Sequence, residues 1–410
     1  MYILGSAGMV RSIGRSATFV FLPLVFADVY HLSYLDIGLL VAAIVPVSTL
    51  SFLAGGHLTD RLGRRPFAIF PSFASAVLLT LLFLYLDSGV ATVMVLWAVN
   101  SVFGGLTRPA QSAMIGDVTT PELAVTAFGV QRVFMNTGFA ISPAVGGFLA
   151  DTVGLPSLFL FGAITSLVEG IILLVLLRET YAGSRSESRR LFGSLAEPFH
   201  DRLFVWLLVA FAGLAVIMNQ FGTPLALYLG AVRGVSFTEF GFIYALNGAL
   251  VVLLQLPISR WIELRGQQYL LAMALGTIGY GSAFLLFDAA TGFPMYLLAM
   301  GVLTIGEDVV SPTQSTLVAQ LGGTERRGRY FGAYNATTNL GRVVGPVLGT
   351  LLLGIGPNGP IFLWGGMFVG ALGVAAGFLY LRARVRRRLK LGGPGGPQSS
   401  PGGALLLGSG

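Results

Sequence analysis

The sequence predicts an all-α integral membrane protein, with twelve transmembrane helices in two pseudo-symmetric six-helix bundles. Three observations support this fold class. Charged residues make up 10% of the chain, whereas a soluble globular domain carries about 25%. Apolar segments of roughly 18 to 25 residues recur along the whole length, and each can cross a hydrocarbon core about 30 Å thick. The second half of the sequence also repeats a pattern of the first half.

The apolar segments are expected to be helices, because they lack the strict alternation of polar and apolar residues that a membrane barrel requires. The chain has 56 glycines, and small residues let spanning helices approach closely. The expected spans are residues 2–27, 37–56, 67–86, 91–115, 126–149, 157–177, 203–229, 239–259, 269–287, 294–318, 330–353 and 360–381. The first span lacks the basic start and the cleavage site of a removable signal peptide, so we expect it to stay in the membrane.

Basic residues predict the orientation. Arginines are concentrated in alternate connections, at 61–65, 178–202, 260–265 and 326–329, and in the tail at 382–388. By the positive-inside rule these connections and both termini are cytoplasmic, which requires an even number of spans. We therefore expect a multi-pass protein of the cell membrane. The net charge of +7 then reflects topology and does not indicate a nucleic-acid partner.

An internal repeat divides the chain. At an offset of 203 residues, identical residues align without a gap; those of the first half are Pro109, Gln111, Ser112, Glu122, Phe128, Gly129, Asn136, Gly138, Pro143 and Gly146. The same offset pairs Ser33 with Ser236 and Asp36 with Glu239. Two parallel halves of this kind are typical of transporters. We expect an N-terminal bundle over 1–180, a cytoplasmic linker over 181–202, a C-terminal bundle over 203–385 and a basic, then low-complexity tail over 386–410.

Two motifs carry a family resemblance. The turn from Gly56 to Arg65 resembles the signature between helices 2 and 3 of the major facilitator superfamily, and the stretch 138–147 resembles the helix 5 motif of its drug/proton antiporter branch. The resemblance covers the chain outside the tail and implies the major facilitator fold and transport by alternating access. Two residues depart from the pattern: Ser142 replaces a usual Gly, and Asn100 replaces the usual Arg of the helix 4 motif, although Gly104 fits it.

The resemblance also implies gating residues. Asp60 and Arg64 are four residues apart and share a helix face, and in this family such residues form a charge cluster with an acid matched here by Asp117. That cluster would favour the outward-facing state. The predicted gating set is Gly56, Asp60, Arg61, Gly63, Arg64, Arg65, Asp117, Gly138, Pro143, Gly146, Gly147, Gly345 and Pro346. Alternatively, the arginines only anchor the topology and the small residues only allow close packing.

Ionisable residues inside the spans are the candidates for substrate binding or proton coupling, because a charge near the bilayer centre costs at least about 2.5–3.5 kcal/mol. They are Asp308, Glu307, Arg108, Arg15, Arg342, Glu169 and Arg11. The resemblance implies that helices 1, 4, 7 and 10 line a cavity, which favours Arg15, Arg108, Glu307 and Asp308. Adjacent carboxylates repel, so we expect one of the acidic pair to carry a proton, and we favour Asp308. The alternatives are structural salt bridges and, for Glu169, a packing partner.

The leading functional prediction is proton-coupled efflux of small amphipathic or lipophilic compounds. The alternative is proton-linked uptake or exchange of a small organic anion, which is favoured by an excess of arginine: with Arg132, the spans hold five arginines against three acids. A non-transporting membrane enzyme or sensor is the third possibility. No phosphate-binding loop, zinc-spaced histidines or Ser/His/Asp set occurs, so we expect no enzyme, no metal and no cofactor. The resemblance further implies that the protein works as a monomer.

Overall fold

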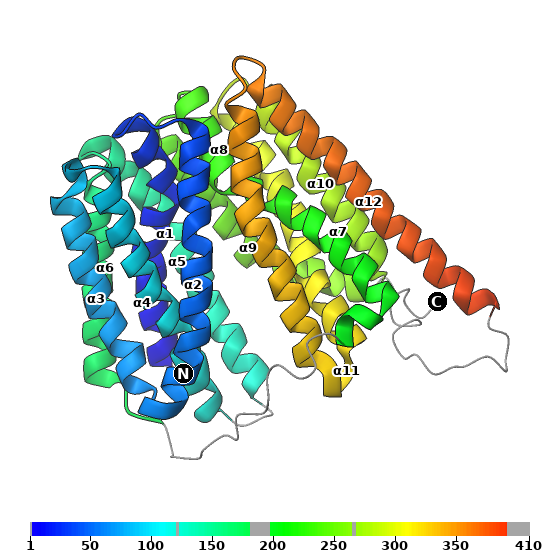
Figure 1. Ribbon diagram of the computed structural model, residues 1–410, viewed down its shortest axis with the longest axis horizontal. Coiled ribbons are helices and arrows are strands. Elements are labelled where there is room, and N and C mark those ends of the chain that lie inside the picture. The colour runs from blue at the N-terminus through cyan, green and yellow to red at the C-terminus, as the bar shows by residue number, and fades with distance from the viewer. Residues whose placement is uncertain (1, 120–122, 181–196, 265–267, 392–410) are drawn as a thin grey trace. The chain divides into compact units, whose positions relative to one another are not determined.

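The computed structural model describes residues 2–119, 123–180, 197–264 and 268–391, with the side chains of 60, 124–126, 324–325 and 386–391 left out. The regular structure of these residues is helical throughout, without a strand (Figure 1). The long helices are α1 (Tyr2–Asp28), α2 (Tyr34–Leu62), α3 (Arg65–Leu84), α4 (Val90–Asp117), α5 (Ala124–Thr152), α6 (Ser157–Leu176), α7 (Arg202–Met218), α9 (Phe237–Leu264), α10 (Tyr269–Ala289), α11 (Phe293–Leu353) and α12 (Gly359–Leu391). Shorter pieces are η1 (Leu86–Ser88), η2 (Glu197–His200), η3 (Asn219–Phe221), α8 (Thr223–Leu227) and η4 (Tyr228–Val232).

The number of spans depends on α11. Eleven segments of the described chain are long and apolar enough to cross a membrane, with α7 to η4 counted as one. The eleventh predicted span, 330–353, is helical but is not among these segments; it forms the second part of α11. Gly323 (φ 58°, ψ −163°) separates the two parts, in a conformation that glycine adopts without strain. The repeat offset places Gly323 at position 120, which falls between the end of α4 and the start of α5, so the interruption lies at the boundary between two helices of the first half.

The repeat is visible in helix capping. The N–H of Asp36 donates to the Ser33 hydroxyl at 3.2 Å, and that hydroxyl lies 2.6 Å from the Asp36 carboxylate. Ser236 and Glu239 form the same arrangement at the start of α9, with distances of 3.2 and 3.3 Å. Both pairs satisfy helix N-terminal donors that would otherwise lack a partner. The sequence pairing of Ser33 with Ser236 is therefore also a pairing of local structure.

The chain folds into two compact units. The first comprises the described residues within 1–187 together with Gly222–Ala249. In this unit α1 packs against α5 and α6, α2 against α4, and α3 against α4 and α6. Glycines allow the closest approaches: a side chain at Gly14 would collide with Thr165, and a Cβ at Gly162 would lie 2.8 Å from the Thr18 hydroxyl. Lipid tails are as apolar as the hydrophobic side chains of spanning helices, so the hydrophobic effect does not hold such helices together. Close packing of this kind does.

The first unit also includes α8, η4 and the first part of α9, which pack against α1 and α5. The rings of Phe21 on α1 and Phe240 on α9 meet edge to face, with centroids 4.9 Å apart. A Cβ at Gly230 in η4 would lie 2.5 Å from the side chain of Leu24. Residues that follow the linker in sequence therefore complete the packing around α1.

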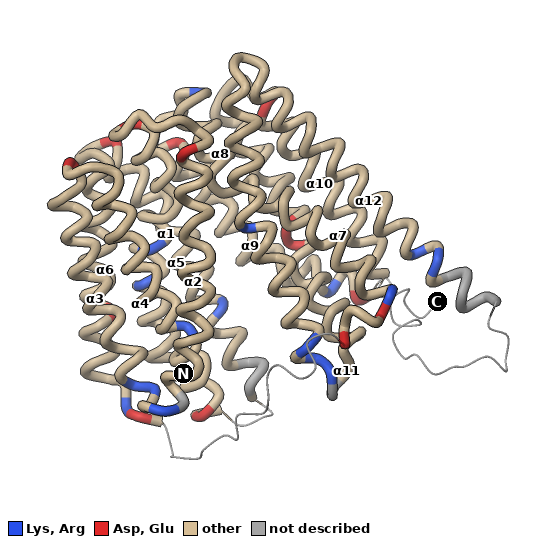
Figure 2. Tube along the Cα trace, viewed as in Figure 1, with Lys and Arg blue, Asp and Glu red and all other residues tan. Residues whose placement is uncertain are grey.

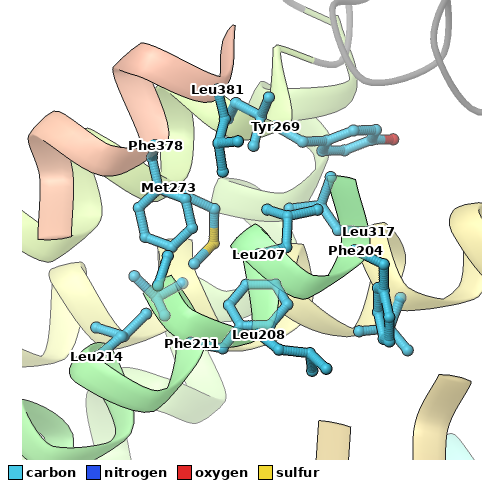
Figure 3. Packing of buried hydrophobic residues seen from close by; sticks show 14 of the residues in the cluster. Phe204, Leu207, Leu208, Phe211, Leu214, Tyr269, Met273, Leu317, Phe378 and Leu381 are labelled. Carbon is cyan, nitrogen blue, oxygen red and sulfur yellow. The ribbon is translucent and has the colours of Figure 1, made fainter. Parts of the chain in front are cut away.

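The second unit comprises the described residues within 188–221 and 250–410. Its core lies between α7, α10, α11 and α12, where Phe204, Phe211, Met273 and Phe378 are buried together (Figure 3). Aromatic contacts reinforce this core; the rings of Phe204 and Tyr330 have centroids 4.3 Å apart. The second part of α11 thus packs into the same core as α7.

Candidate functional site

A buried carboxylate lies inside the first unit, on α6. Glu169 is 1% exposed, and its Oε1 accepts a hydrogen bond from Nε2 of Gln111 on α4 at 3.3 Å. Nη1 of Arg11 on α1 lies 3.9 Å from the same oxygen. An ionised group in a spanning segment is costly unless a partner compensates its charge. The structure therefore joins two predicted candidates, Arg11 and Glu169, in one ion pair where three helices meet.

A second arginine reaches the same place. Nη2 of Arg11 donates to the carbonyl of Gly104 on α4 at 3.4 Å. A Cβ at Gly104 would lie 3.9 Å from Nη2 of Arg11 and 3.9 Å from Nη1 of Arg15, so the bare face of this glycine leaves room for both guanidinium groups. Arg15 also acts electrostatically on the Glu169 carboxylate. We call these five residues, Arg11, Arg15, Gly104, Gln111 and Glu169, the arginine–glutamate cluster.

The acidic pair of the second unit lies in the first part of α11. Asp308 is 2% exposed, whereas Glu307 is half-buried. This difference follows from the roughly 100° between successive residues of a helix. Arg108 on α4 and Arg342 on α11 are both exposed. The predicted positions of Arg108, Glu307 and Asp308 at a cavity remain predictions.

The signature turn gathers charged groups at one end of the first unit. Figure 2 shows basic residues where α2 meets α3 and acidic residues at the other end of this unit. The Arg64 guanidinium forms an ion pair with Asp117, and its Nη1 also donates to the Ala113 carbonyl at 2.9 Å. The side chain of Asp60 lies outside the described residues, while Arg61 is exposed. Arg64 and Asp117 of the predicted charge cluster are therefore in contact.

Glu179, which is not among the predicted site residues, completes this end of the unit. Its carboxylate accepts hydrogen bonds from the N–H groups of Arg64 at 3.3 Å and Arg65 at 3.0 Å, at the start of α3. Gly63 has φ 92°, and a Cβ there would lie 3.1 Å from Glu179 Oε2. A carboxylate at a helix N-terminus is stabilised by the free N–H groups and the helix dipole. The sequence does not predict this role, because Glu179 lies outside the motif and more than 100 residues after Arg64 and Arg65.

The other residues of the signature turn differ in their surroundings. Nε of Arg65 donates to the carbonyl of Leu177 at 2.9 Å, so this arginine ties α3 to the end of α6. Gly56 has no atom within 4 Å of the position that a Cβ would take. Arg65 is therefore a structural link between helices, and its predicted gating role, like that of Gly56 and Arg61, stays a prediction.

The glycines of α5 face two different neighbours. A Cβ at Gly138 would lie 2.8 Å from Ser12, and one at Gly146 would lie 3.1 Å from Ala17, both on α1. Side chains at Gly147 and at Gly241 of α9 would collide with the backbones of Phe237 and Pro143, respectively. The Ser142 hydroxyl, at the position that departs from the motif, donates to the Ile13 carbonyl. The motif region of α5 is therefore held between α1 and α9.

Asp151 links α5 to α9. It is likewise not among the predicted site residues. Its carboxylate accepts hydrogen bonds from the N–H groups of Phe237 at 3.2 Å and Thr238 at 2.7 Å, the first residues of α9. The end of α5 thus caps α9.

In the second unit, a Cβ at Gly345 would lie 2.7 Å from Asn219, and the carbonyl of Gly345 accepts a hydrogen bond from buried Gln220 at 2.9 Å. Pro346, next to this contact, is buried.

Comparison with known proteins decides the family. The sequence pattern of the Major Facilitator Superfamily matches residues 4–287 and 226–406 of the chain. The chain belongs to the Major Facilitator Superfamily. This confirms the resemblance seen in the signature turn, and with it the all-α membrane fold. The protein is a multi-pass membrane transporter of a small-molecule substrate and not an enzyme.

Superfamily members of several kinds resemble the chain. It is 26% identical to a Na(+), Li(+), K(+)/H(+) antiporter of Planococcus maritimus, over 88% of this chain and 90% of that protein. It is 23% identical to Multidrug resistance protein 2 of Bacillus subtilis, over 85% and 88% of the two chains. A solved structure of the nucleoside transporter NupG superposes with a TM-score of 0.77 at 14% identity, covering 93% of this chain and 99% of that one. This structural likeness supports the fold alone.

Proposed function

We propose that this transporter carries out proton-coupled efflux of small amphipathic or lipophilic compounds by alternating access. The observation that carries the proposal is the contact of Glu169 with Arg11 and Gln111 inside the first unit. A carboxylate held between a guanidinium and an amide has two stable states: it is ionised while Arg11 stays near it, and neutral once it takes a proton. Protonation weakens its attraction to Arg11, and this change can be coupled to a rearrangement of α1 against α6.

The relatives support both parts of the proposal. One similar protein is named for the exchange of alkali cations with protons, and another for multidrug resistance. We propose protons as the coupling ion, with Glu169 as the coupling group and Asp308 as a second buried carboxyl. The Arg64–Asp117 pair and the contacts of Gly147 and Pro143 with α9 then hold opposite ends of the first unit in one state of the cycle. The termini lie on the cytoplasmic side.

The test uses purified protein in liposomes that contain a pH-sensitive dye. Addition of ethidium, a lipophilic cation, should change the lumenal pH in vesicles with the parent protein. Glu169→Gln removes the titratable group but keeps its size, so ethidium should still bind while the pH change is lost. Glu263→Gln, an exposed acid at the end of α9, is the matched control and should behave like the parent. An unchanged pH response in Glu169→Gln would contradict the proposed coupling group.

Exchange of a small organic anion is the second candidate function. The excess of arginine in the spans favours it, because guanidinium groups bind carboxylates well. Vesicles loaded with succinate distinguish the two: anion exchange predicts uptake of labelled succinate, and drug efflux predicts none. Arg108→Ala and Asp308→Asn belong in the same assay. If both variants transport and couple like the parent, neither residue belongs to the transport site.

A further inference from the structure

We propose that the C-terminal end of α12 binds the head groups of anionic phospholipids, such as phosphatidylglycerol, through Arg384 and the basic residues that follow it. The partner is a lipid of the leaflet that surrounds this end of the helix. This binding is separate from the proposed transport mechanism, because neither Glu169 nor the transported compound takes part in it.

Helix α12 is longer than a membrane span requires. It has 33 residues, which extend about 50 Å, whereas the hydrocarbon core of a bilayer is about 30 Å thick. The stretch from Gly359 to Leu381 contains no charged residue and is long enough to cross that core by itself. The remaining turns of the helix, from Arg382 to Leu391, therefore extend into the head-group region.

The two sides of α12 have different surroundings. Phe378 and Leu381 are buried in the core of the second unit (Figure 3), and Val385 is buried one turn further along. On the other side Val369 and Tyr380 are exposed, Tyr380 by 62%. In a spanning helix such a surface meets lipid, and tyrosine is enriched at the level of the head groups. Tyr380 therefore marks the place where the lipid-facing side of α12 leaves the hydrocarbon.

Arg384 continues this lipid-facing side beyond Tyr380. The two residues are four apart, a spacing that places them on the same face of a helix. Arg384 is half-buried, and no described residue forms a hydrogen bond or an ion pair with it. Arg382 has a different role, since its Nη2 donates to Oε1 of Gln268 at the start of α10 at 2.5 Å. Arg384 is therefore the described arginine at this end that a lipid phosphate can reach.

The sequence places more positive charge beside Arg384. The segment 382–391 contains no acid, and the helix backbone continues through Leu391. Figure 2 shows basic residues at this end of α12. The basic residues of the segment are Arg382, Arg384, Arg386, Arg387, Arg388 and Lys390. Clusters of four to eight such residues next to a spanning helix attract anionic lipids.

Acids near the start of α7 do not balance this charge, because they have other partners. Glu197 forms ion pairs with Arg326 and Arg329, and the Asp201 carboxylate caps α7. The basic end of α12 also continues a surface that already meets lipid. The anionic groups nearest to it are therefore lipid phosphates, which favours head groups over a soluble polyanion.

Brominated lipids test the proposal, since they quench the fluorescence of a tryptophan that they touch. Tyr380→Trp places a reporter beside Arg384, and the parent protein gives the background of the native tryptophans. In nanodiscs of phosphatidylcholine with a minor fraction of phosphatidylglycerol, brominated phosphatidylglycerol should occupy the site about fivefold beyond its share of the lipid, as one basic residue near an anionic head group predicts. High salt should reduce this preference by screening. Quenching that merely follows the lipid composition would overturn the proposal.

Two variants of the reporter protein make the test specific. The combination of Arg384→Gln, Arg387→Gln and Arg388→Gln removes three charges and should abolish most of the preference. The matched control, Arg384→Lys with Arg387→Lys and Arg388→Lys, keeps the charges at the same positions and should keep most of the preference. Thermal unfolding identifies the variants that are folded. A folded glutamine variant with the full preference would show that these residues do not bind the lipid.

A second copy of the chain is the other partner that could cover this surface. In that case neither brominated lipid would quench the reporter strongly and the nanodiscs would contain dimers, a result that would contradict lipid binding. Glu169→Gln separates this measurement from the transport mechanism and should keep the lipid preference, because Glu169 lies inside the first unit. Loss of the pH response in that variant therefore leaves the lipid proposal unaffected, and failure of the lipid test leaves the proposed coupling unaffected.

Discussion

Glu169 and Arg11 depend on each other at the scale of single residues. Each is an ionisable side chain within a spanning helix, and each was selected from the sequence for that reason alone. The structure adds that they are partners, with Gln111 as a third member. A buried ion pair need not stabilise a fold relative to an apolar one, but removal of a single partner leaves an uncompensated charge. Removal of one partner should therefore lower the free energy of unfolding more than replacement of both partners.

Arg11→Ala should therefore destabilise the protein strongly, by about 3–5 kcal/mol. Glu169→Gln leaves the partly buried Arg11 without its counter-charge and should also be destabilising. The double variant Arg11→Ala with Glu169→Gln should lose less than the sum of the two, because it leaves neither charge behind. Chemical unfolding in detergent measures all three. Additive losses would show that the two side chains do not interact.

Glu179→Gln tests the carboxylate at the start of α3. The amide keeps the shape but loses the negative charge that interacts with the N–H groups of Arg64 and Arg65, so we expect a loss of about 1 kcal/mol. Glu263→Gln, an exposed acid on α9, should cost much less. A shift in unfolding midpoint for both variants by the same amount would argue against a specific role for Glu179.

At the scale of helices, α5 carries two sets of small residues with different neighbours. Gly138 and Gly146 lie against α1, whereas Gly147 lies against the start of α9, which Asp151 also caps. The sequence placed all of these glycines in a single predicted gating set. Their separation into two contacts follows from the 100° step between Gly146 and Gly147 along a helix.

Gly147→Ala should disturb the contact between α5 and α9, since a Cβ there would collide with the Phe237 backbone. Overpacking of this kind costs about 1–3 kcal/mol. Gly129 offers a matched control on the same helix, because no atom lies within 4 Å of its Cβ position. Gly129→Ala should be neutral or slightly stabilising, since alanine favours helix. Thermal unfolding of the two variants should differ clearly, and equal midpoints would contradict the assigned contact.

The sequence predicted the elements well and the contacts between them poorly. Length and apolar character located the spans, since crossing the bilayer dictates both. The repeat offset paired the caps of Ser33 and Ser236 and accounts for the interruption at Gly323. In contrast, Glu179 and Asp151 act on helices distant in sequence, and hydropathy contains no information about which side chain reaches which neighbour.

At the scale of the whole molecule, the repeat predicted equal halves over 1–180 and 203–385, and this division stays a prediction. The compact units of the structure are composed differently, because α8, η4 and the start of α9 pack with the first unit. Such packing ties residues beyond the linker to α1 and α5.

In the proposed mechanism, protonation of a carboxyl within the first unit is coupled to substrate binding. The most direct measurement records proton release when ethidium is added to purified protein in weakly buffered detergent solution. The parent and Glu263→Gln should release protons, and Glu169→Gln should release none although ethidium still binds. Proton release of the same size from folded Glu169→Gln would contradict it.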